Sequence, residues 1–406
     1  MHQAVAAALL PCSAMVRRVG RSAATAVAAA LLLVATSCTS GSGDQGSTVP
    51  SNPASTPRAV VACAMSVDQS ASQTHAAFFS GVSAAGPKDV WAVGTQFYSS
   101  KPGPLVQRWN GSSWKSMIRE NDRRHGLQLT DVAVVGPNDV WTVGFLQYGG
   151  ASALHWNGST LTQIQTTPGL ADTDLLGVTA FGSRDVWAVG IAPSSDGYDH
   201  PLIQHFTGSG WTVVPAPATA GYTSGLRDID GLGSDSLWTV GWVVGADQLY
   251  RPLVERRFGG RWEVVPMPHV FDDATLSGVA VAGPRDVWTV GWSWNGRGSR
   301  SLVMHWNGSG WRVLHVTGPA GAAAHLSSVA VDGDDIIAAG QSPDADGVLQ
   351  PVAFRLHGST WTSHAAPGAS DGGGFQGIDA VHGVGMMAVG IQWADEGYGS
   401  LVQQGC

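Results

Sequence analysis

An all-β fold, built from repeats of one four-stranded antiparallel unit, is predicted by this sequence from three observations. Residues 276–318 contain four short runs in which apolar residues alternate with small or polar ones, and a period of two is typical of strands. Degraded copies of this stretch recur from residue 80 to the C-terminus. The composition, with 54 Gly, 17 Trp and only 13% charged residues in 406, favours turns and strands over long helices.

The repeat unit is predicted to be a meander of four strands. They are Leu276 to Val281, Val287 to Trp294, Leu302 to Trp306 and Trp311 to Val316. Tight-turn sequences, Gly283-Pro284-Arg285-Asp286 and Asn307-Gly308-Ser309-Gly310, join the first two and the last two runs. Asn-Gly is expected to supply the positive φ angles of a two-residue hairpin. The second and third runs are joined by a longer loop, Ser293 to Ser301.

The second strand recurs seven times. Its copies are residues 89–94, 139–144, 185–190, 235–241, 286–291, 335–340 and a worn copy ending at 387–390. A spacing of roughly fifty residues is that of four-stranded propeller blades. Seven copies therefore predict a seven-bladed β-propeller, in a single domain of residues 59–406.

The ring is predicted to be closed by an N-terminal strand in the last blade. The seventh copy lacks a fourth strand, and the apolar run Arg58 to Val67 has no partner. An open ring would expose sheet edges, so we expect this run to fill the missing place. Cys63 and Cys406 lie on the two runs, and exported chains usually pair their cysteines. We predict a Cys63–Cys406 disulfide; the alternative is two buried free thiols.

Residues 1–37 are predicted to be a lipoprotein signal peptide. A basic start, an apolar run from Ala23 to Ala35 and small residues precede Cys38, which is the pattern of an export signal. The ending Ala35-Thr36-Ser37-Cys38 resembles a bacterial lipobox, which implies that Cys38 is lipidated. The alternatives are an ordinary signal with an incidental cysteine and a twin-arginine signal, whose flanking residues do not fit. Met15 is a second candidate start.

Residues 38–58 are predicted to be a flexible tether, because this Ser/Gly/Pro-rich stretch has no apolar periodicity. Removal of residues 1–37 leaves 19 basic and 30 acidic residues, a formal charge of −11. Such a charge disfavours nucleic acid and direct adhesion to anionic lipid. We expect an exported monomer, held by its lipid anchor alone at the outer face of the cytoplasmic membrane or in the cell envelope.

A family resemblance follows from the strand pattern. The apolar first strand, the second strand ending in Val-Gly, the aromatic residue in the third and the Trp that opens the fourth resemble the kelch repeat and related bacterial propellers of the galactose-oxidase type, over residues 60–406. Kelch repeats usually carry a Gly-Gly pair where a single Gly, such as Gly291, stands here. The resemblance implies that the first strand of each unit is innermost. The longer loops and the inter-blade loops then share one face, where a ligand is expected near the channel mouth.

Nine residues form the candidate ligand-binding set. Four tryptophans lie outside the repeat positions, just after the second-strand Gly, and the others lie on the long loops. Aromatic faces beside carboxylates can hold sugars or cationic groups. The set is Trp242, Trp292, Trp294, Trp393, Tyr198, Asp199, His200, Asp395 and Tyr398. The alternative is that the four tryptophans extend the packing between blades, since they keep the alternation of the core-facing residues.

Three repeated features are predicted to be architectural. The Asp that opens the second strand, Asp286 in the reference unit, is expected to accept backbone N–H groups in its turn rather than to bind metal. Asn307-Gly308-Ser309 matches a glycosylation acceptor, but its place in a hairpin favours a turn role. Gly291 lies on the flatter face of its strand, so a large residue there is expected to push neighbouring blades apart.

No set of residues predicts catalysis, a metal or a cofactor. The chain has no His-Glu-x-x-His or phosphate loop. The match Gly368-x-Ser370-x-Gly372 lies in a Gly/Ser-rich loop rather than on a strand-to-helix elbow. We predict a binding or protein-interaction propeller with a glycan or protein ligand. The alternative is an extracellular carbohydrate-active enzyme, a glycoside hydrolase or lyase, that uses loop carboxylates.

Overall fold

The computed structural model describes most of the second of two units into which the chain divides, Met1–Val60 and Val61–Cys406. The described residues are 66–67, 76–98, 101–119, 124–166, 171–219, 222–268, 273–296, 298–314, 316–358, 360–365, 371–381, 385–394 and 397–405. The predicted signal peptide and tether lie outside these residues. So do Cys38, Cys63, Asp395 and Cys406, and the predictions made for them stand as predictions.

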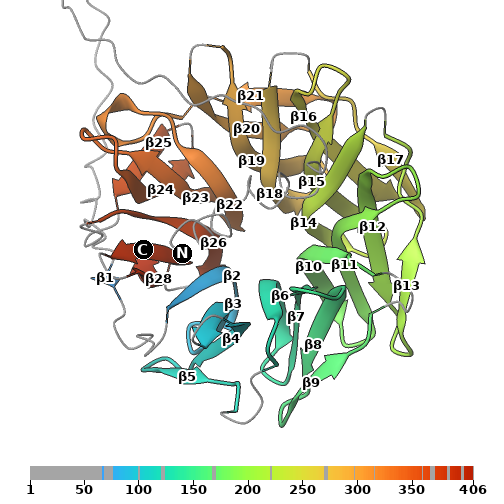
Figure 1. Cartoon of the computed structure of the whole chain (residues 1–406). Coiled ribbons are helices and arrows are strands. Elements are labelled where there is room, and N and C mark those ends of the chain that lie inside the picture. The colour runs from blue at the N-terminus through green and yellow to red at the C-terminus, as the bar shows by residue number, and fades with distance from the viewer. Residues whose placement is uncertain are drawn as a thin grey trace, which may run out of the picture. The chain divides into compact units, whose positions relative to one another are not determined.

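Seven sheets, each of four antiparallel strands, form a ring (Figure 1), which confirms the predicted fold class. We number them as blades 1 to 7 in chain order. Blade 1 holds β2 (Ala77–Gly86), β3 (Asp89–Tyr98), β4 (Lys101–Trp109) and β5 (Trp114–Ser116). Blade 2 holds β6 (Leu127–Gly136), β7 (Asp139–Leu146), β8 (Ala151–Trp156) and β9 (Leu161–Ile164). Blade 3 holds β10 (Asp174–Gly182), β11 (Asp185–Pro193), β12 (Asp199–Phe206) and β13 (Trp211–Val214).

The remaining blades repeat this order. Blade 4 holds β14 (Thr223–Gly233), β15 (Ser236–Val244), β16 (Tyr250–Phe258) and β17 (Arg261–Val264). Blade 5 holds β18 (Asp273–Gly283), β19 (Asp286–Trp294), β20 (Ser299–Trp306) and β21 (Trp311–Leu314). Blade 6 holds β22 (His325–Asp332), β23 (Asp335–Pro343), β24 (Leu349–His357) and β25 (Thr360–Ala365). Blade 7 holds β26 (Gly373–Val381), β27 (Gly385–Ala394), β28 (Gly397–Gly405) and β1 (Ser66–Val67).

The two-residue strand β1 takes the outer place of blade 7. It pairs antiparallel with β28, with Ser66 opposite Gln404 and Val67 opposite Gln403. The rest of the run Arg58 to Val67 lies outside the described residues. Closure of the ring by that whole run therefore stays a prediction.

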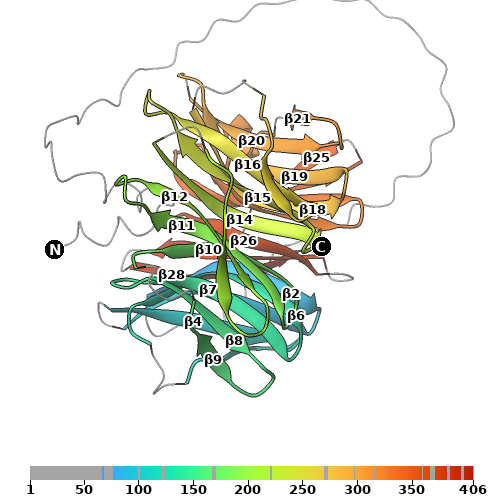
Figure 2. The ribbon, with the colours of Figure 1, turned by 90° about the vertical axis from the view of Figure 1, so that its right-hand side faces the viewer.

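The first strand of each blade lies nearest the middle of the ring (Figure 1). Figure 2 shows the ring from the side, with the strands of blades 1 and 2 below and those of blades 5 and 6 above. Because every sheet is a meander, the turns after each first and third strand lie at one end, which we call the short-turn face. The loops after each second strand and the inter-blade connections lie at the other end, the long-loop face.

The core lies between neighbouring blades, and the second strand divides its side chains between two of these layers. Trp288 and Val290 pack against blade 6, while Val287 packs against blade 4, as the alternation of side chains along a strand requires. Apart from the 3₁₀ turn η3 (Pro319–Gly321), the described part of the chain is strands, turns and loops. None of its helices has the length and apolar character to cross a membrane.

Every first strand contains a β-bulge next to the second-strand glycine. In blade 5, Leu276 pairs with Gly291 but Gly278 pairs with Val290, so one residue on β18 is extra. A Cβ atom on Gly291 would lie 2.1 Å from the Thr275 carbonyl oxygen of its own blade. The corresponding shifts in the other blades are Phe79/Gly81, Leu129/Asp131, Leu175/Gly177, Leu226/Asp228, Leu326/Ser328 and Phe375/Gly377.

This contact corrects the packing scheme expected for Gly291. The glycine is required by the bulge within its own blade, and a larger residue would strike the first strand before it reached a neighbouring blade. The bulge also reverses the alternation of the first strand. Leu129 and Val132, three positions apart, both pack on blade 1. Of the two residues between them, Asp131 is turned toward the channel and blade 3.

Candidate functional site

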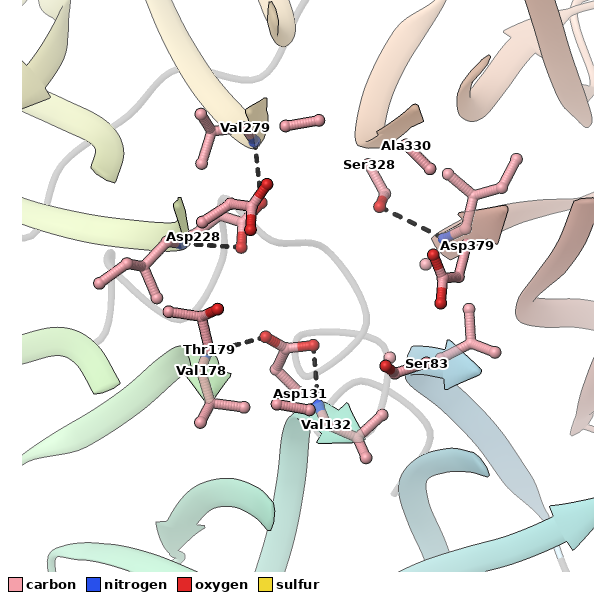
Figure 3. A pocket seen from close by; sticks show the side chains of 18 of the residues that line it. Ser83, Asp131, Val132, Val178, Thr179, Asp228, Val279, Ser328, Ala330 and Asp379 are labelled. Carbon is pink, nitrogen blue, oxygen red and sulfur yellow. Dashed lines mark hydrogen bonds between the residues drawn. The ribbon is translucent and has the colours of Figure 1, made fainter. Parts of the chain in front are cut away.

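The seven first strands enclose a central cavity of about 390 Å³ (Figure 3). Small and polar side chains line it at the level of the bulges. The residue after each bulge is, from blade 1 to blade 7, Gly81, Asp131, Gly177, Asp228, Gly278, Ser328 and Gly377. Glycine thus alternates with Asp or Ser until the ring returns to its start, where two glycines meet because seven is odd.

The polar members of this ring join neighbouring blades. One oxygen of Asp131 accepts the Val132 N–H of its own strand, and the other accepts the Val178 N–H of blade 3, each at 2.8 Å. Asp228 makes the same pair of bonds, with Val279 of blade 5 as its cross-blade donor. In blade 6, the Ser328 hydroxyl accepts the Ile378 N–H of blade 7 at 3.3 Å.

The glycines of the ring allow neighbouring first strands to approach closely at the junctions that the first layer of bonds does not bridge. A Cβ atom on Gly81 would lie 2.9 Å from the Asp131 Cα, and one on Gly177 would lie 2.8 Å from the Asp228 Cα. Any larger residue would force the two first strands apart. The alternation therefore gives blades 2, 4 and 6 an acceptor for a main-chain N–H on the side of the next blade and a close backbone contact on the side of the preceding blade.

A second layer of the same bridges lies two residues further along. Asp230 accepts the Val281 N–H of blade 5, and Asp379 accepts the Ala84 N–H of blade 1, both at 2.8 Å. The Ser83 hydroxyl accepts the Val134 N–H of blade 2 at 3.3 Å. We call the six acceptors of the two layers the channel latch: Asp131, Asp228, Ser328, Asp230, Asp379 and Ser83.

Burial and mutual repulsion act on the latch carboxyls. Burial, with the charge of Asp228, raises the pKa of Asp131 well above its usual value. Burial raises the pKa of Asp228 to about 6, that of Asp230 to about 7 and that of Asp379 to about 6. The amide hydrogen bonds oppose this rise, because they favour the charged form.

The hydrogen bonds of the channel latch account for the presence of buried carboxyls in the channel, and no ligand is needed to explain them. For Asp131, Asp228 and Asp379, both carboxyl oxygens accept main-chain N–H groups. In the described part of the chain, no group of three or more His, Cys, Asp or Glu side chains is arranged to hold a metal ion. The arrangement joins blades, and sequence reasoning missed it. The available signal was an Asp two residues after the Leu of a first strand, in a position that is Gly in four other blades.

The repeated Asp that opens the second strand bonds to side chains rather than to the main-chain N–H groups of its own turn. Asp286 accepts the Trp288 indole N–H and pairs with His305 Nε2, each at 2.8 Å, while the two rings stack at 4.2 Å. Asp139 and Asp185 make the same set with a Trp and a His. The expectation of backbone N–H donors was wrong in this respect, because the third strand brings a nitrogen-bearing side chain alongside.

The Asn-Gly-Ser sequences are turns, as predicted. The Asn307 side-chain oxygen accepts the N–H groups of Ser309 and Gly310 at 3.0 and 3.1 Å. Trp306 pairs with Trp311, so the connection has four residues rather than two. Only Gly308 takes a positive φ, 92°. The asparagine contributes its side chain and not the backbone conformation that was expected of it.

One further acid lies between the blades. Glu255 on β16 is fully buried, its two oxygens have no hydrogen-bond partner within the described residues, and burial raises its pKa to about 8. It lies opposite Thr239. The equivalent residues of blades 1, 3 and 7 are buried glutamines, Gln107, Gln204 and Gln403.

The four non-repeat tryptophans differ in their surroundings. Trp242 is buried, with the Arg227 guanidinium 4.9 Å from its ring centre. Trp292 is half-buried and stacks on His325 of blade 6, with ring centres 5.6 Å apart. Trp393 is half-buried too, and its ring lies against Gly372. Trp294 is 43% exposed. Of the four, Trp294 offers the most surface to a ligand.

The other predicted residues fall into two groups on the long-loop face. Tyr198, Asp199 and His200 belong to the blade 3 loop and the start of β12, where His200 Nε2 lies 2.8 Å from Asp196 Oδ2. Tyr398 belongs to blade 7 and contacts Phe78 and Phe97 of blade 1, with ring centres 6.2 and 5.8 Å apart. The structure does not bring the eight described candidates into one site, and Asp395 lies outside the described residues.

Exposed aromatic side chains gather on the long-loop face. Those of the described residues are Tyr148, Tyr198, Tyr222, Phe258 and Trp294. All but Phe258 lie on that face, Tyr148, Tyr198 and Tyr222 in loops or connections and Trp294 at the end of β19. Tyr222 was missed by the sequence analysis, because it lies just before a first strand, in a connection without a repeat pattern.

No family model matches this chain, and no curated protein matches its sequence. Solved structures do share its fold. YCF48 from Cyanidioschyzon merolae aligns with a TM-score of 0.53 at 14% identity, covering 84% of this chain and 98% of that one. YCF48 bound to D1 peptide aligns with a TM-score of 0.52 at 14% identity, covering 84% and 96%. The extracellular domain of BT4673 from B. thetaiotaomicron aligns with a TM-score of 0.52 at 12% identity, covering 83% and 39%.

The chain shares a propeller fold with these proteins. At identities of 12% and 14% the likeness concerns the fold alone. It agrees with the seven blades seen here, and it leaves kelch membership a prediction.

Proposed function

We propose that this chain is an exported binding or interaction propeller whose ligand lies on the long-loop face. The distribution of exposed aromatic side chains carries the proposal, since among the described residues Tyr148, Tyr198, Tyr222 and Trp294 lie on that face and Phe258 alone lies on the other. Aromatic residues are enriched where proteins bind partners. Loops on a rigid scaffold are the usual place for binding residues.

The channel latch supports this choice of face. Its acids are engaged by main-chain N–H groups, so the centre of the ring has a structural task. One propeller of the same fold, YCF48, has a complex with a peptide, which is a precedent for a peptide or protein ligand here. Kinship with kelch and galactose-oxidase-type propellers rests on the strand pattern alone.

The proposal includes a lipid anchor at Cys38, which places the propeller at the outer face of the cytoplasmic membrane or in the cell envelope. It rests on the sequence pattern before Cys38 and on the Ser/Gly/Pro-rich tether after it. Metabolic labelling with an alkyne fatty acid tests it. The full-length chain should take up label, and Cys38→Ser should not; label that persists in this variant would refute the anchor.

Binding by the long-loop face is tested with the full-length chain on peptide and glycan arrays, beside hydrolysis assays on polysaccharides. The variant with Tyr148, Tyr198, Tyr222 and Trp294 all changed to Ala should lose most of the bound signal. Phe258→Ala, the matched change on the short-turn face, should keep it. Turnover of any polysaccharide would overturn a purely binding role, and equal signals from both variants would overturn the choice of face.

A further inference from the structure

One place on the long-loop face brings together exposed aromatic side chains from two blades. Tyr198, in the loop between β11 and β12, and Tyr222, just before β14, have ring centres 5.5 Å apart and ring planes at 51°. They are 40% and 43% exposed. The two rings therefore form an open angle at the surface, where blade 3 meets blade 4.

The loop that carries Tyr198 is closed by its own hydrogen bonds. The Ser194 N–H donates to the Tyr198 carbonyl at 2.9 Å, and the Gly197 N–H donates to the Ser194 carbonyl at 3.0 Å. Gly197 takes a φ of 84°, which suits glycine in a tight turn. The Tyr198 N–H in turn donates to Asp196 Oδ1 at 3.0 Å. This tyrosine is thus held in place before a ligand arrives, which lowers the entropic cost of binding.

The second tyrosine, Tyr222, is held by a backbone hydrogen bond to blade 4, whose first strand it directly precedes. The Tyr222 N–H donates to the Val244 carbonyl at 3.0 Å. The next residue, Thr223, donates its hydroxyl to the Asp199 carbonyl of blade 3 at 3.2 Å. This side-chain bond ties the two blades together directly beside the rings.

The charge beside the rings is negative. Asp196 is half exposed, and hydrogen bonds from the Tyr198 N–H and from His200 lower its pKa, so its carboxylate is ionised at neutral pH. Asp199 directly follows Tyr198 in the sequence, and no Lys or Arg occurs between residues 193 and 200. In the adjacent blade 4 loop, Arg251 is engaged by Asp247 at 2.9 Å. A cation arriving here would meet two aromatic faces and an ionised carboxylate.

We propose that Tyr198, Tyr222 and Asp196 form a subsite for a cationic side chain, Arg or Lys, of a peptide ligand. The inference rests on the proposed function of the long-loop face and names the chemistry of its partner. Aromatic faces attract cations, and the chain uses the same contact internally, with Arg257 5.0 Å from the centre of the Trp187 ring. The formal charge of −8 would steer a basic partner toward the protein. A neutral sugar could stack on the rings but would gain nothing from this field.

The test measures binding of fluorescein-labelled octa-arginine and octa-lysine to the full-length chain, with octa-glutamate as the negative probe. We expect the basic peptides to bind and Tyr198→Ala/Tyr222→Ala to weaken them about five- to thirty-fold, from the usual strength of two cation–π contacts. Phe258→Ala is the matched control, because this ring is 72% exposed and lies on the short-turn face. It should change the affinity less than two-fold.

Asp196→Asn separates charge from shape. Asn keeps an oxygen for the Tyr198 N–H, so the loop should stay closed while affinity and its salt dependence both fall. Unchanged melting curves of all variants would show that folding is intact. Equal affinity of Tyr198→Ala/Tyr222→Ala and Phe258→Ala would overturn the subsite. Binding of chitohexaose at these tyrosines that does not depend on salt, and with which the basic peptides do not compete, would also overturn the subsite. Array binding that survives Tyr198→Ala/Tyr222→Ala but is lost in the four-residue variant would reject the subsite alone and keep the proposed function.

Discussion

Asp131 accepts the main-chain N–H of Val178, on the next blade, at 2.8 Å. Two blades are therefore joined at the channel by one carboxyl, in addition to the apolar layer between them. Five of the seven junctions carry such a bond from the channel latch. The junctions of blade 3 with blade 4 and of blade 5 with blade 6 have Gly177 with Thr179 and Gly278 with Ala280 at these positions.

The first prediction concerns this bond. Asp131→Ala removes both acceptors and leaves the Val132 and Val178 N–H groups unpaired in the wall of the channel. We expect a loss of about 1–3 kcal/mol in the free energy of unfolding, measured by urea denaturation. Asp131→Ser should lose less, because Ser328 bridges blades at the equivalent position. Asp334→Ala, in an exposed turn, is the control and should stay within about 0.5 kcal/mol. A loss for Asp131→Ala no larger than that control would contradict the latch.

The second prediction concerns pH. The pKa values of Asp228, Asp230 and Asp379 are about 6, 7 and 6, all above the ordinary value of 3.8. Between pH 3.8 and about pH 7, these carboxyls keep protons in the folded chain that they have already released in the unfolded chain. The free energy of unfolding therefore falls as pH rises. We expect the urea midpoint to be highest near pH 4 and to decline up to about pH 7. Asp230→Asn/Asp379→Asn should flatten this decline; a midpoint that rises over the same range in the unmodified chain contradicts the account.

The third prediction concerns Glu255, whose pKa is about 8. The stability that its protonated form provides is complete below its ordinary pKa of 4.5 and is lost as pH rises through about 8. Glu255→Gln introduces the residue that blades 1, 3 and 7 carry there. We expect the variant to match the unmodified chain at pH 5 and to exceed it by roughly 1–3 kcal/mol at pH 9, by urea denaturation. A difference that does not change with pH would show that the acid is not held protonated.

The fourth prediction concerns the bulge. Gly291→Ala places a Cβ atom 2.1 Å from the Thr275 carbonyl oxygen, so β18 must shift. We expect a loss of about 1–3 kcal/mol or more and a matching fall in Tm. Gly310→Ala is the control, since nothing lies within 4 Å of its Cβ position. Equal Tm values for the two variants would show that the bulge accommodates a Cβ atom at Gly291 without loss of stability, which contradicts this prediction.

Much of the fold could be predicted because the same strand pattern occurs seven times in the sequence. The predicted runs of the reference unit lie within β18 to β21, apart from two residues at the end of the fourth. The period of two along β19 accounts for the packing of Trp288 and Val287 on opposite faces. The bulge could not be found in this way, because it inserts a residue into one strand while the alternation on both sides of it looks regular.

The candidate site was less predictable for two physical reasons. The channel latch depends on bonds between residues about fifty positions apart, such as Asp131 and Val178, so no local pattern marks it. The pair of Tyr198 and Tyr222 is likewise formed only when two blades meet. Loop composition predicted a ligand on the long-loop face, and this stays a proposal. It could not tell that Trp242 would be buried and Trp294 exposed, because both follow a second-strand glycine.

The most direct measurement of the central claim is the yield of photo-cross-links from the two faces of the full-length chain in cells. Benzoylphenylalanine would replace Trp294 on the long-loop face or Phe258 on the short-turn face, two exposed aromatic positions. We predict a discrete cross-linked partner from position 294 and none from position 258. Cross-links of equal yield from both positions, or from position 258 alone, would contradict a ligand-binding surface on the long-loop face.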